Sequence, residues 1–210
     1  MAAREPEVLV IEAGPAGLWT VFQLAIHGIR SLILESAAAA GGQCAQLYAD
    51  KPVHDLPGFG AIDAGKVVDL LLGQITRFEP DFRFSTIATS IMPSPEGFEV
   101  ATAAAETFRA RHVILATGIG AFCGRPEQRL ELPVGLVLLD GKAAVSTATF
   151  ATSIEGLYCI GDAAHYPGKL PLLVSAFHEA ALAAFAIRSA RGGARQAMRR
   201  QSKKASVTGR

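Results

Sequence analysis

The strongest constraint on this fold is a strand, a turn, a helix and a second strand within the first 35 residues. A β-rich run over residues 7–11 leads into the turn Gly14-Pro15-Ala16-Gly17. Helical spacing of apolar residues follows over residues 18–27, and residues 31–34 are apolar again. Two strands joined by a helix in this way form a βαβ unit with parallel strands. We therefore predict an α/β fold built on a parallel sheet.

The turn of this unit carries a pattern that suits a dinucleotide. Gly14, Ala16 and Gly17 would let backbone N–H groups approach a pyrophosphate at the start of the helix. Glu35 closes the second strand, close to the roughly 20-residue distance at which an acid binds the ribose. The same spacing also fits an ordinary strand-to-helix turn.

One position departs from the GxGxxG fingerprint. Its first glycine would fall at position 12, where this chain has Glu12. The carboxylate either points away from the pyrophosphate, or lies near it and weakens binding by like-charge repulsion. We expect the first arrangement, with a turn that is widened to suit the side chain.

Further elements are predicted around this unit. Apolar spacing over residues 63–78 predicts a helix with Asp63 as its cap, and residues 172–190 are Ala-rich and helical. Short strands are predicted at 87–92, 98–102, 107–109, 112–116 and 157–160, with a hairpin turn at 93–97. We therefore expect a small antiparallel layer beside the parallel sheet.

Composition supports one sizeable domain. Half of the 210 residues are hydrophobic and 19% are charged, which is enough apolar surface for a core. No apolar run reaches the ~18 residues of a membrane span, and residues 1–7 lack the pattern of a signal peptide. We therefore expect a cytoplasmic protein without a membrane span. Cys44, Cys123 and Cys159 are far apart and are interpreted as buried reduced thiols, and the histidines lack metal-ligand spacing.

The last 23 residues differ in charge from the rest. Residues 188–210 contain basic side chains and no acid, whereas acids exceed bases in residues 1–187. Such a tail suits a frayed helix end, or a solvated extension that contacts a partner. Nucleic-acid binding is not expected, because the tail has no aromatic residue for stacking on bases.

Several longer motifs carry a resemblance to a known family. They are Gly41-Gly42-Gln43-Cys44-Ala45-Gln46-Leu47-Tyr48, Pro52-Val53-His54-Asp55-Leu56-Pro57-Gly58-Phe59, Ala116-Thr117-Gly118, residues 152–162 ending in Gly161-Asp162, Tyr166-Pro167-Gly168-Lys169 and Phe177-His178-Glu179-Ala180-Ala181. In this order the chain resembles the ferredoxin/flavodoxin–NADP reductases of the thioredoxin-reductase-like type. The motifs cover most of residues 7–187.

The resemblance implies that FAD binds non-covalently. It implies that Glu35 binds the adenosine ribose, that Ala88 lies near the adenine, and that Asp162 after Gly161 accepts hydrogen bonds from the ribityl or phosphate-proximal part. Gln43, Tyr48 and Phe122 would lie beside the isoalloxazine ring, although Tyr48 and Phe122 also fit as core aromatics. A helix beginning around Glu179 and Ala180 would direct its N–H groups at the pyrimidine edge of the flavin.

One part of the family pattern is absent from the interior of the chain. The resemblance implies a second, NADPH-binding domain between the Ala116-Thr117-Gly118 segment and Gly161-Asp162, and too few residues separate these motifs to form one. The deletion is expected near residues 126–134. We therefore expect residues 1–187 to form a single FAD-binding domain, followed by a basic tail at 188–210.

These observations predict a single FAD-binding Rossmann-like α/β domain, with a parallel sheet, flanking helices and a small antiparallel β layer. The predicted function is electron transfer with a protein partner such as a ferredoxin, or with a diffusible redox agent, and without direct oxidation of NADPH. The resemblance also points to a homodimer. The alternative is a redox-silent FAD-binding or scaffold protein derived from a reductase.

Overall fold

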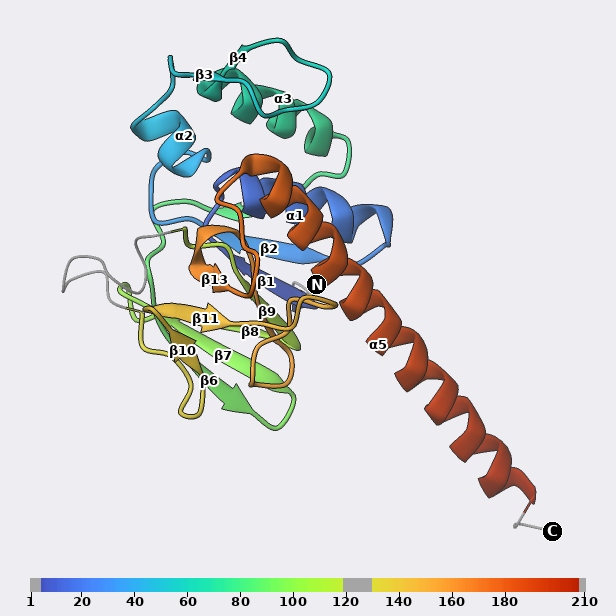
Figure 1. Cartoon of the computed structure of the whole chain (residues 1–210). Coiled ribbons are helices and arrows are strands. Elements are labelled where there is room, and N and C mark those ends of the chain that lie inside the picture. The colour runs from blue at the N-terminus through green and yellow to red at the C-terminus, as the bar shows by residue number, and fades with distance from the viewer. Residues whose placement is uncertain (1–4, 119–129, 208–210) are drawn as a thin grey trace.

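The computed structural model describes residues 5–118 and 130–207, with side chains described as far as Gly192. Its centre is a five-stranded parallel sheet in the order β12-β9-β1-β2-β5 (Figure 1). The strands are β1 (Val8–Ile11), β2 (Ser31–Leu34), β5 (Asp81–Arg83), β9 (His112–Leu115) and β12 (Leu157–Cys159). The chain leaves β1 toward β2 on one side and returns with β9 on the other.

Side chains of the central sheet alternate between two buried faces. Val8 and Val10 of β1 lie in one core cluster, and Leu9 and Ile11 lie in the other. Both faces of β1 are therefore covered, as is usual for a parallel sheet between two layers. The continuous apolar run of this strand follows from that double burial.

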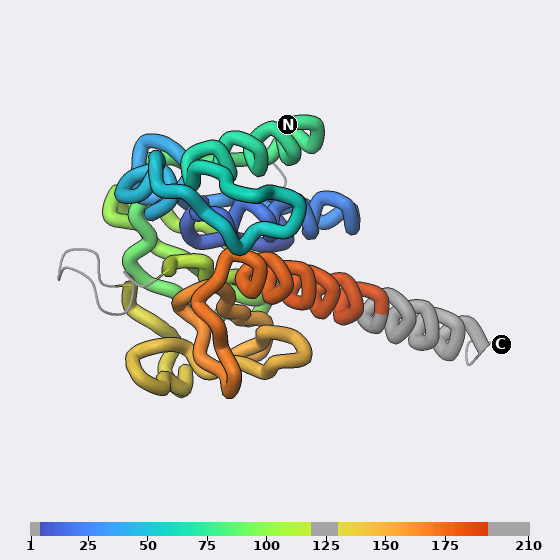
Figure 2. The backbone as a smooth tube through the Cα atoms, turned by 45° about the horizontal axis from the view of Figure 1, so that its top comes forward, coloured from blue at the N-terminus to red at the C-terminus, as the bar shows by residue number. Residues whose placement is uncertain are grey.

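Helices cover one face of the sheet (Figure 1). They are α1 (Pro15–Ile26), α3 (Ala64–Thr76) and the long α5 (Leu173–Val207). The smooth trace in Figure 2 shows α5 running beside α1 on the same side of the molecule. Small side chains of α5 allow this close packing, because Ala180, Ala183 and Ala184 are fully buried in the core cluster. Asp63 occupies the N-cap of α3 as predicted, but its side chain makes no capping hydrogen bond.

An antiparallel sheet covers the opposite face (Figure 1). It contains β6 (Ala88–Ser94), β7 (Gly97–Thr102) and β8 (Thr107–Ala110), in the order β6-β7-β8. Its inner residues Ile91, Phe98 and Val100 are almost fully buried against the central sheet. The predicted fold class is confirmed, with a parallel sheet, helices on one face and a small antiparallel β layer on the other.

Short elements complete the fold and were not predicted. They are α2 (Gly42–Gln46), β3 (Pro52–Val53), β4 (Ile62–Asp63), β10 (Leu138–Leu139), β11 (Lys142–Ala144), the 3-10 turn η2 (Gly161–Ala163) and β13 (Ala164–His165). β3 pairs with β4, and β10, β11 and β13 form a three-stranded sheet. Elements of two to five residues carry too little periodicity to be recognised in a sequence.

The C-terminal helix begins within one residue of the stretch predicted at 172–190, but it is longer than predicted. It begins at Leu173 and continues to Val207, so the helix passes through the boundary predicted after residue 187. Arg191 is held against the body, donating a hydrogen bond to the Gly28 carbonyl oxygen at 3.0 Å and lying 3.5 Å from the Glu7 carboxylate. Within the described residues, Leu173–Gly192 is one helix of the length and hydropathy of a membrane span, and a third of that stretch is buried in the fold.

Candidate functional site

A cavity of about 530 Å³ opens at the carboxyl ends of the central strands. Four of its walls are the β1–α1 turn, Ser36 after β2, the Ala116-Thr117-Gly118 segment after β9, and Gly161-Asp162 after β12. α2 and the first turn of α5 close its sides. In open α/β sheets, ligands bind where the strand order reverses, and the reversal here lies between β1 and β9.

Gly14 and Gly17 serve different purposes. A Cβ on Gly17 would lie 2.1 Å from the Glu12 carbonyl oxygen, so this glycine permits the close packing of α1 on the end of β1. A Cβ on Gly14 would meet nothing within 4 Å, although Gly14 lines the cavity. Gly14 therefore leaves room on the cavity side, where the first turn of α1 presents backbone N–H groups.

The acid predicted to bind ribose has structural partners. Glu35 is only 1% exposed, and its carboxylate accepts hydrogen bonds from the backbone N–H groups of Ala13 and Ala37, both at 2.7 Å. It ties the β1–α1 turn to the end of β2, and it is not among the residues that line the cavity. Its neighbours Glu12 and Ser36 line the cavity instead.

Glu12 has a strained backbone and an unusual side-chain environment. Its φ of 77° is in the left-handed region that glycine adopts at no cost. The Ser36 hydroxyl lies 3.0 Å from its carboxyl oxygen. Burial, followed by the charge of Glu35, raises the pKa of Glu12 to about 8. Glu12 thus has the left-handed backbone conformation that usually requires glycine, and its carboxyl group points toward Ser36 at the end of β2.

Two of the three residues predicted beside the flavin ring, Gln43 and Tyr48, line the cavity. Tyr48 is 46% exposed with Lys51 5.3 Å from its ring centroid, so it is not a core aromatic. The side-chain amide nitrogen of Gln43 lies beside Gly118, 3.5 Å from where a Cβ on that glycine would be. Cys44 lies between them, and burial and then the charge of Asp162 raise the pKa of its thiol. Ala88 lines the cavity at the start of β6.

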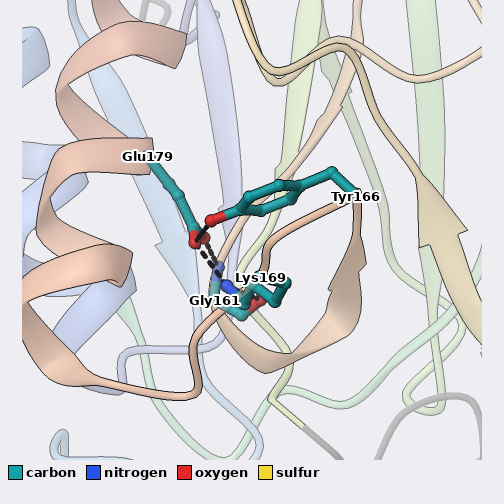
Figure 3. Close-up of polar contacts among 4 residues, drawn as sticks. All are labelled: Gly161, Tyr166, Lys169 and Glu179. Atoms are coloured by element: carbon teal, nitrogen blue, oxygen red, sulfur yellow. Dashed lines mark hydrogen bonds and ion pairs between the residues drawn. The ribbon is translucent and has the colours of Figure 1, made fainter.

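A buried ion pair fixes the Gly161-Asp162 turn (Figure 3). Glu179 is fully buried and accepts hydrogen bonds from the Gly161 N–H at 2.6 Å and the Tyr166 hydroxyl at 2.7 Å. Lys169 forms an ion pair with the same carboxylate and donates to the Gly161 carbonyl oxygen at 2.9 Å. Both backbone polar groups of Gly161 are therefore bound, which positions Asp162 at the rim of the cavity.

The expectation that a helix begins around Glu179 and Ala180 is wrong. α5 begins at Leu173, because the apolar spacing of its core face already starts there. Leu172, Leu173 and Ala176 line the cavity, whereas Glu179 and Ala180 are fully buried outside it. The backbone N–H groups near the cavity are thus those of the first turn of α5. Phe122 and Cys123 lie outside the described residues.

Sequence reasoning missed two polar groups of the cavity, Ser36 and Thr117. The Thr117 hydroxyl is buried and has no hydrogen-bond partner among the described residues, although Thr117 lines the cavity. A buried hydroxyl without a partner is costly, which a ligand with polar atoms would relieve. Together with the open space at Gly14, this group fits an elongated polar cofactor such as FAD. The signal available in the sequence was that each residue lies two positions beyond the end of a parallel strand.

The chain is similar to individual known proteins, although no protein-family model matches it. A ferredoxin–NADP reductase from Leptothrix cholodnii is 37% identical over 155 residues, covering 73% of this chain and 41% of the relative. One from an Acidovorax species is 26% identical over 310 aligned positions, covering 86% of this chain and 88% of the relative. The crystal structure of T. acidophilum thioredoxin reductase superposes with a TM-score of 0.73 at 17% identity, over 90% of this chain and 99% of that one, which shows the shared fold.

The extent of these matches is informative. The chain spans about two fifths or less of the first relatives it matches, such as 34% of the Paracidovorax citrulli ferredoxin–NADP reductase at 43% identity. The alignment with the Acidovorax protein runs over 310 positions, whereas this chain has 210 residues, so part of that relative has no counterpart here. The resemblance indicated by the motifs, to ferredoxin–NADP reductases with a thioredoxin-reductase-like fold, is confirmed.

Proposed function

We propose, from the premise that this chain is a sequence relative of the ferredoxin–NADP reductases, that it binds FAD and exchanges electrons with a redox partner without oxidising NADPH directly. The observation that carries the proposal is the cavity at the carboxyl ends of β1, β9 and β12. The open glycine turn at Gly14 and the braced turn at Gly161-Asp162 both line it, and they lie close together, because a Cβ on Gly161 would be 3.4 Å from the Ala16 Cβ. Both turns suit a dinucleotide.

Different residues of the chain would bind different parts of the cofactor. Backbone N–H groups at the start of α1 would bind the pyrophosphate, with Gly14 giving them access. Ser36 lies after β2, where an adenosine ribose is expected, and it donates a hydrogen bond to the carboxyl group of Glu12, which follows β1. Asp162 would accept hydrogen bonds at the flavin half, and the Thr117 hydroxyl would gain its missing partner.

At the flavin half, the described residues present a polar side and an apolar side. Gln43 and Tyr48 lie on one wall, and Leu172, Leu173 and Ala176 on another. Bound FAD would supply the redox chemistry itself. The first-turn N–H groups of α5 would stabilise negative charge that develops nearby, and the apolar side chains would exclude water. The chain thus positions the cofactor and sets its electrostatic environment.

Failure to react directly with NADPH is part of the proposal. A nicotinamide must be held against the flavin ring in a near-attack geometry. The chain has a single strand-glycine-helix fingerprint, and part of the Acidovorax relative lacks a counterpart in it. We expect reduction by millimolar NADPH or NADH to be slower than about one per second, below ordinary turnover. Anaerobic stopped-flow absorbance measures this, and faster reduction contradicts the proposal.

The partner is proposed from the exposure of the cavity and from the relatives. Tyr48 and Leu172 are both more than a third exposed beside the cavity, so another surface can approach there. The relatives are named for ferredoxin, and we propose a ferredoxin-type protein as the electron partner. We also propose a homodimer in the cytoplasm. Light scattering of the FAD-loaded protein tests the dimer, and reduced ferredoxin added anaerobically tests the partner.

A redox-silent FAD-binding protein is the second candidate. The observation that favours it is Glu12, which stands at a glycine position of the dinucleotide fingerprint. Both candidates predict bound FAD, and they differ in whether reduced ferredoxin bleaches the flavin absorbance. Complete bleaching and reoxidation support electron transfer, whereas a flavin that resists reduction supports the silent protein.

Replacement of Asp162 tests the cofactor assignment. Asp162→Ala should lose most of its flavin, because the turn at Gly161 remains braced while the carboxylate is removed. Asp69→Ala is the matched control, since Asp69 is an exposed acid of α3 outside the cavity. Flavin released by denaturation and separated by chromatography gives the stoichiometry. Full retention of FAD by Asp162→Ala, or FMN in the wild type, contradicts the assignment.

A further inference from the structure

Two carboxyl groups meet at the end of β2, at the part of the cavity assigned above to the adenosine half of the cofactor. The Ser36 hydroxyl lies 3.0 Å from a Glu12 carboxyl oxygen and 3.4 Å from a Glu35 carboxyl oxygen, so both carboxyl groups lie within reach of one donor. Two carboxylates this close repel each other, which favours a proton on one of them. The arrangement of donors around the pair shows which group carries it.

Glu35 has the larger set of hydrogen-bond donors. Each of its oxygens accepts a backbone N–H, from Ala13 and from Ala37, at 2.7 Å. Glu12 has fewer donors, and both belong to Ser36: its hydroxyl at 3.0 Å and its backbone N–H. That hydroxyl has one hydrogen and a second acceptor, the Glu35 oxygen, at 3.4 Å. The proton therefore belongs to Glu12, whose carboxyl group lines the cavity.

We propose that Glu12 is a proton-carrying binding residue of the cavity, which accompanies an anionic dinucleotide in its neutral form and opposes that ligand once it ionises. This inference rests on the proposed function and deepens it. At the first glycine position, a neutral carboxyl group adds no charge near the phosphates, and it offers an O–H that a ribose oxygen can accept. An ionised one would place a second negative charge beside Glu35 and near the pyrophosphate.

No other group in contact with Glu12 explains such a proton. Glu35 is the one charged side chain of the described residues that acts on it. The first turn of α1 has no acid, and Ala116, Thr117 and Gly118 after β9 do not titrate. The remaining titratable groups that line the cavity are Cys44, Tyr48, Lys51, His54, Asp55 and Asp162.

The sign of the pH dependence follows from the protonation state. Burial and the charge of Glu35 raise the pKa of Glu12 to about 8, so in the free protein Glu12 is neutral below that pH. Binding that requires the proton is constant below pH 7 and weakens above pH 8, by up to tenfold per pH unit. Between pH 6.5 and pH 9 we expect the dissociation constant of FAD to rise about tenfold.

The test measures binding of FAD to the deflavinated protein by quenching of flavin fluorescence between pH 6.5 and pH 9. Calorimetry at pH 8.5 in two buffers of different ionisation enthalpy counts the protons taken up. We expect the wild type to take up between half and one proton. Glu12→Gln should bind FAD with a pH-independent constant, and Glu96→Gln, an exposed acid at the β6–β7 turn, should behave like the wild type.

The outcomes separate this inference from the proposed function. A wild-type dissociation constant that stays flat to pH 9 overturns the inference while FAD binding stands. Equal pH dependence in Glu12→Gln also overturns it, because another group would then carry the proton. If Glu12→Gln fails to fold, Glu12→Gly gives the same comparison, since glycine adopts the φ of 77° freely. Absence of FAD binding at every pH overturns the proposed function itself.

Discussion

Replacement of Lys169 by Met tests how the buried ion pair supports the site. The side chain of Lys169 is 13% exposed and that of Glu179 is fully buried, so the pair lies almost out of water. Lys169→Met keeps most of the volume and leaves the Glu179 carboxylate with two neutral donors, the Gly161 N–H and the Tyr166 hydroxyl. The variant therefore isolates the cost of an uncompensated buried charge.

The expected magnitude is large. Removing one partner of a buried pair costs about 3–5 kcal/mol, and the partial exposure of Lys169 places this case at about 3 kcal/mol. For a chain of this length the melting temperature should fall by about 6–12 °C. Glu179→Gln should cost less, because its amide oxygen can still accept the Gly161 N–H.

A double-mutant cycle in urea, on protein without flavin, provides the measurement. Lys169→Met combined with Glu179→Gln should be more stable than the sum of the single changes predicts, by at least about 1 kcal/mol. A loss below about 1 kcal/mol for Lys169→Met, or strict additivity, would show that the pair is solvated and does not brace Gly161.

Three further outcomes follow from the same geometry. Gly17→Ala should lower the free energy of unfolding by about 3 kcal/mol in a urea titration, because its Cβ meets the Glu12 carbonyl oxygen at 2.1 Å. The control, Gly73→Ala in α3, should be neutral or stabilising, because an added Cβ there meets nothing within 4 Å. Glu12→Gly should raise that free energy by about 1 kcal/mol through relief of the left-handed backbone, and change FAD affinity at pH 7 by less than about tenfold, as equilibrium titration can verify. Cys44 should need a higher pH than a free thiol to react with iodoacetamide, because burial raises its pKa. A pH–rate profile measured by mass spectrometry tests this, and a profile like that of a free thiol would contradict it.

The helices and strands could be predicted from the sequence wherever the pattern of apolar residues was clear. The first βαβ unit, α3, the β6–β7–β8 layer and β12 lie within a few residues of the predicted positions. β5 (Asp-Phe-Arg) and β11 (Lys-Ala-Ala) could not be predicted, because neither has the apolar run that marks the equally short β12 (Leu-Tyr-Cys). The full length of α5 was missed, because the predicted helix ended at residue 190, whereas the helix continues to Val207.

The sequence predicted which segments line the cavity more reliably than it predicted which side chains point into it. Gly14, Ala16, Gln43, Tyr48, Ala88, Gly161 and Asp162 all line one cavity. The glycine turn indicated the first two, and the resemblance to the reductase family indicated the other five. Glu35 and Glu179 could not be assigned from sequence, because each carboxylate is used by nearby backbone N–H groups that only the fold brings together. Ser36, the residue after Glu35, and Thr117 line the cavity, and a strand-end position alone does not reveal which way a side chain points.

The flavin content of the purified protein tests the central claim most directly. After denaturation, chromatography of the released chromophore should give FAD at about one per chain, and the deflavinated protein should rebind FAD with a visible spectrum shifted from that of free flavin. Release of FMN, or a deflavinated, folded protein that fails to bind FAD at any pH from 6.5 to 9, would contradict the account.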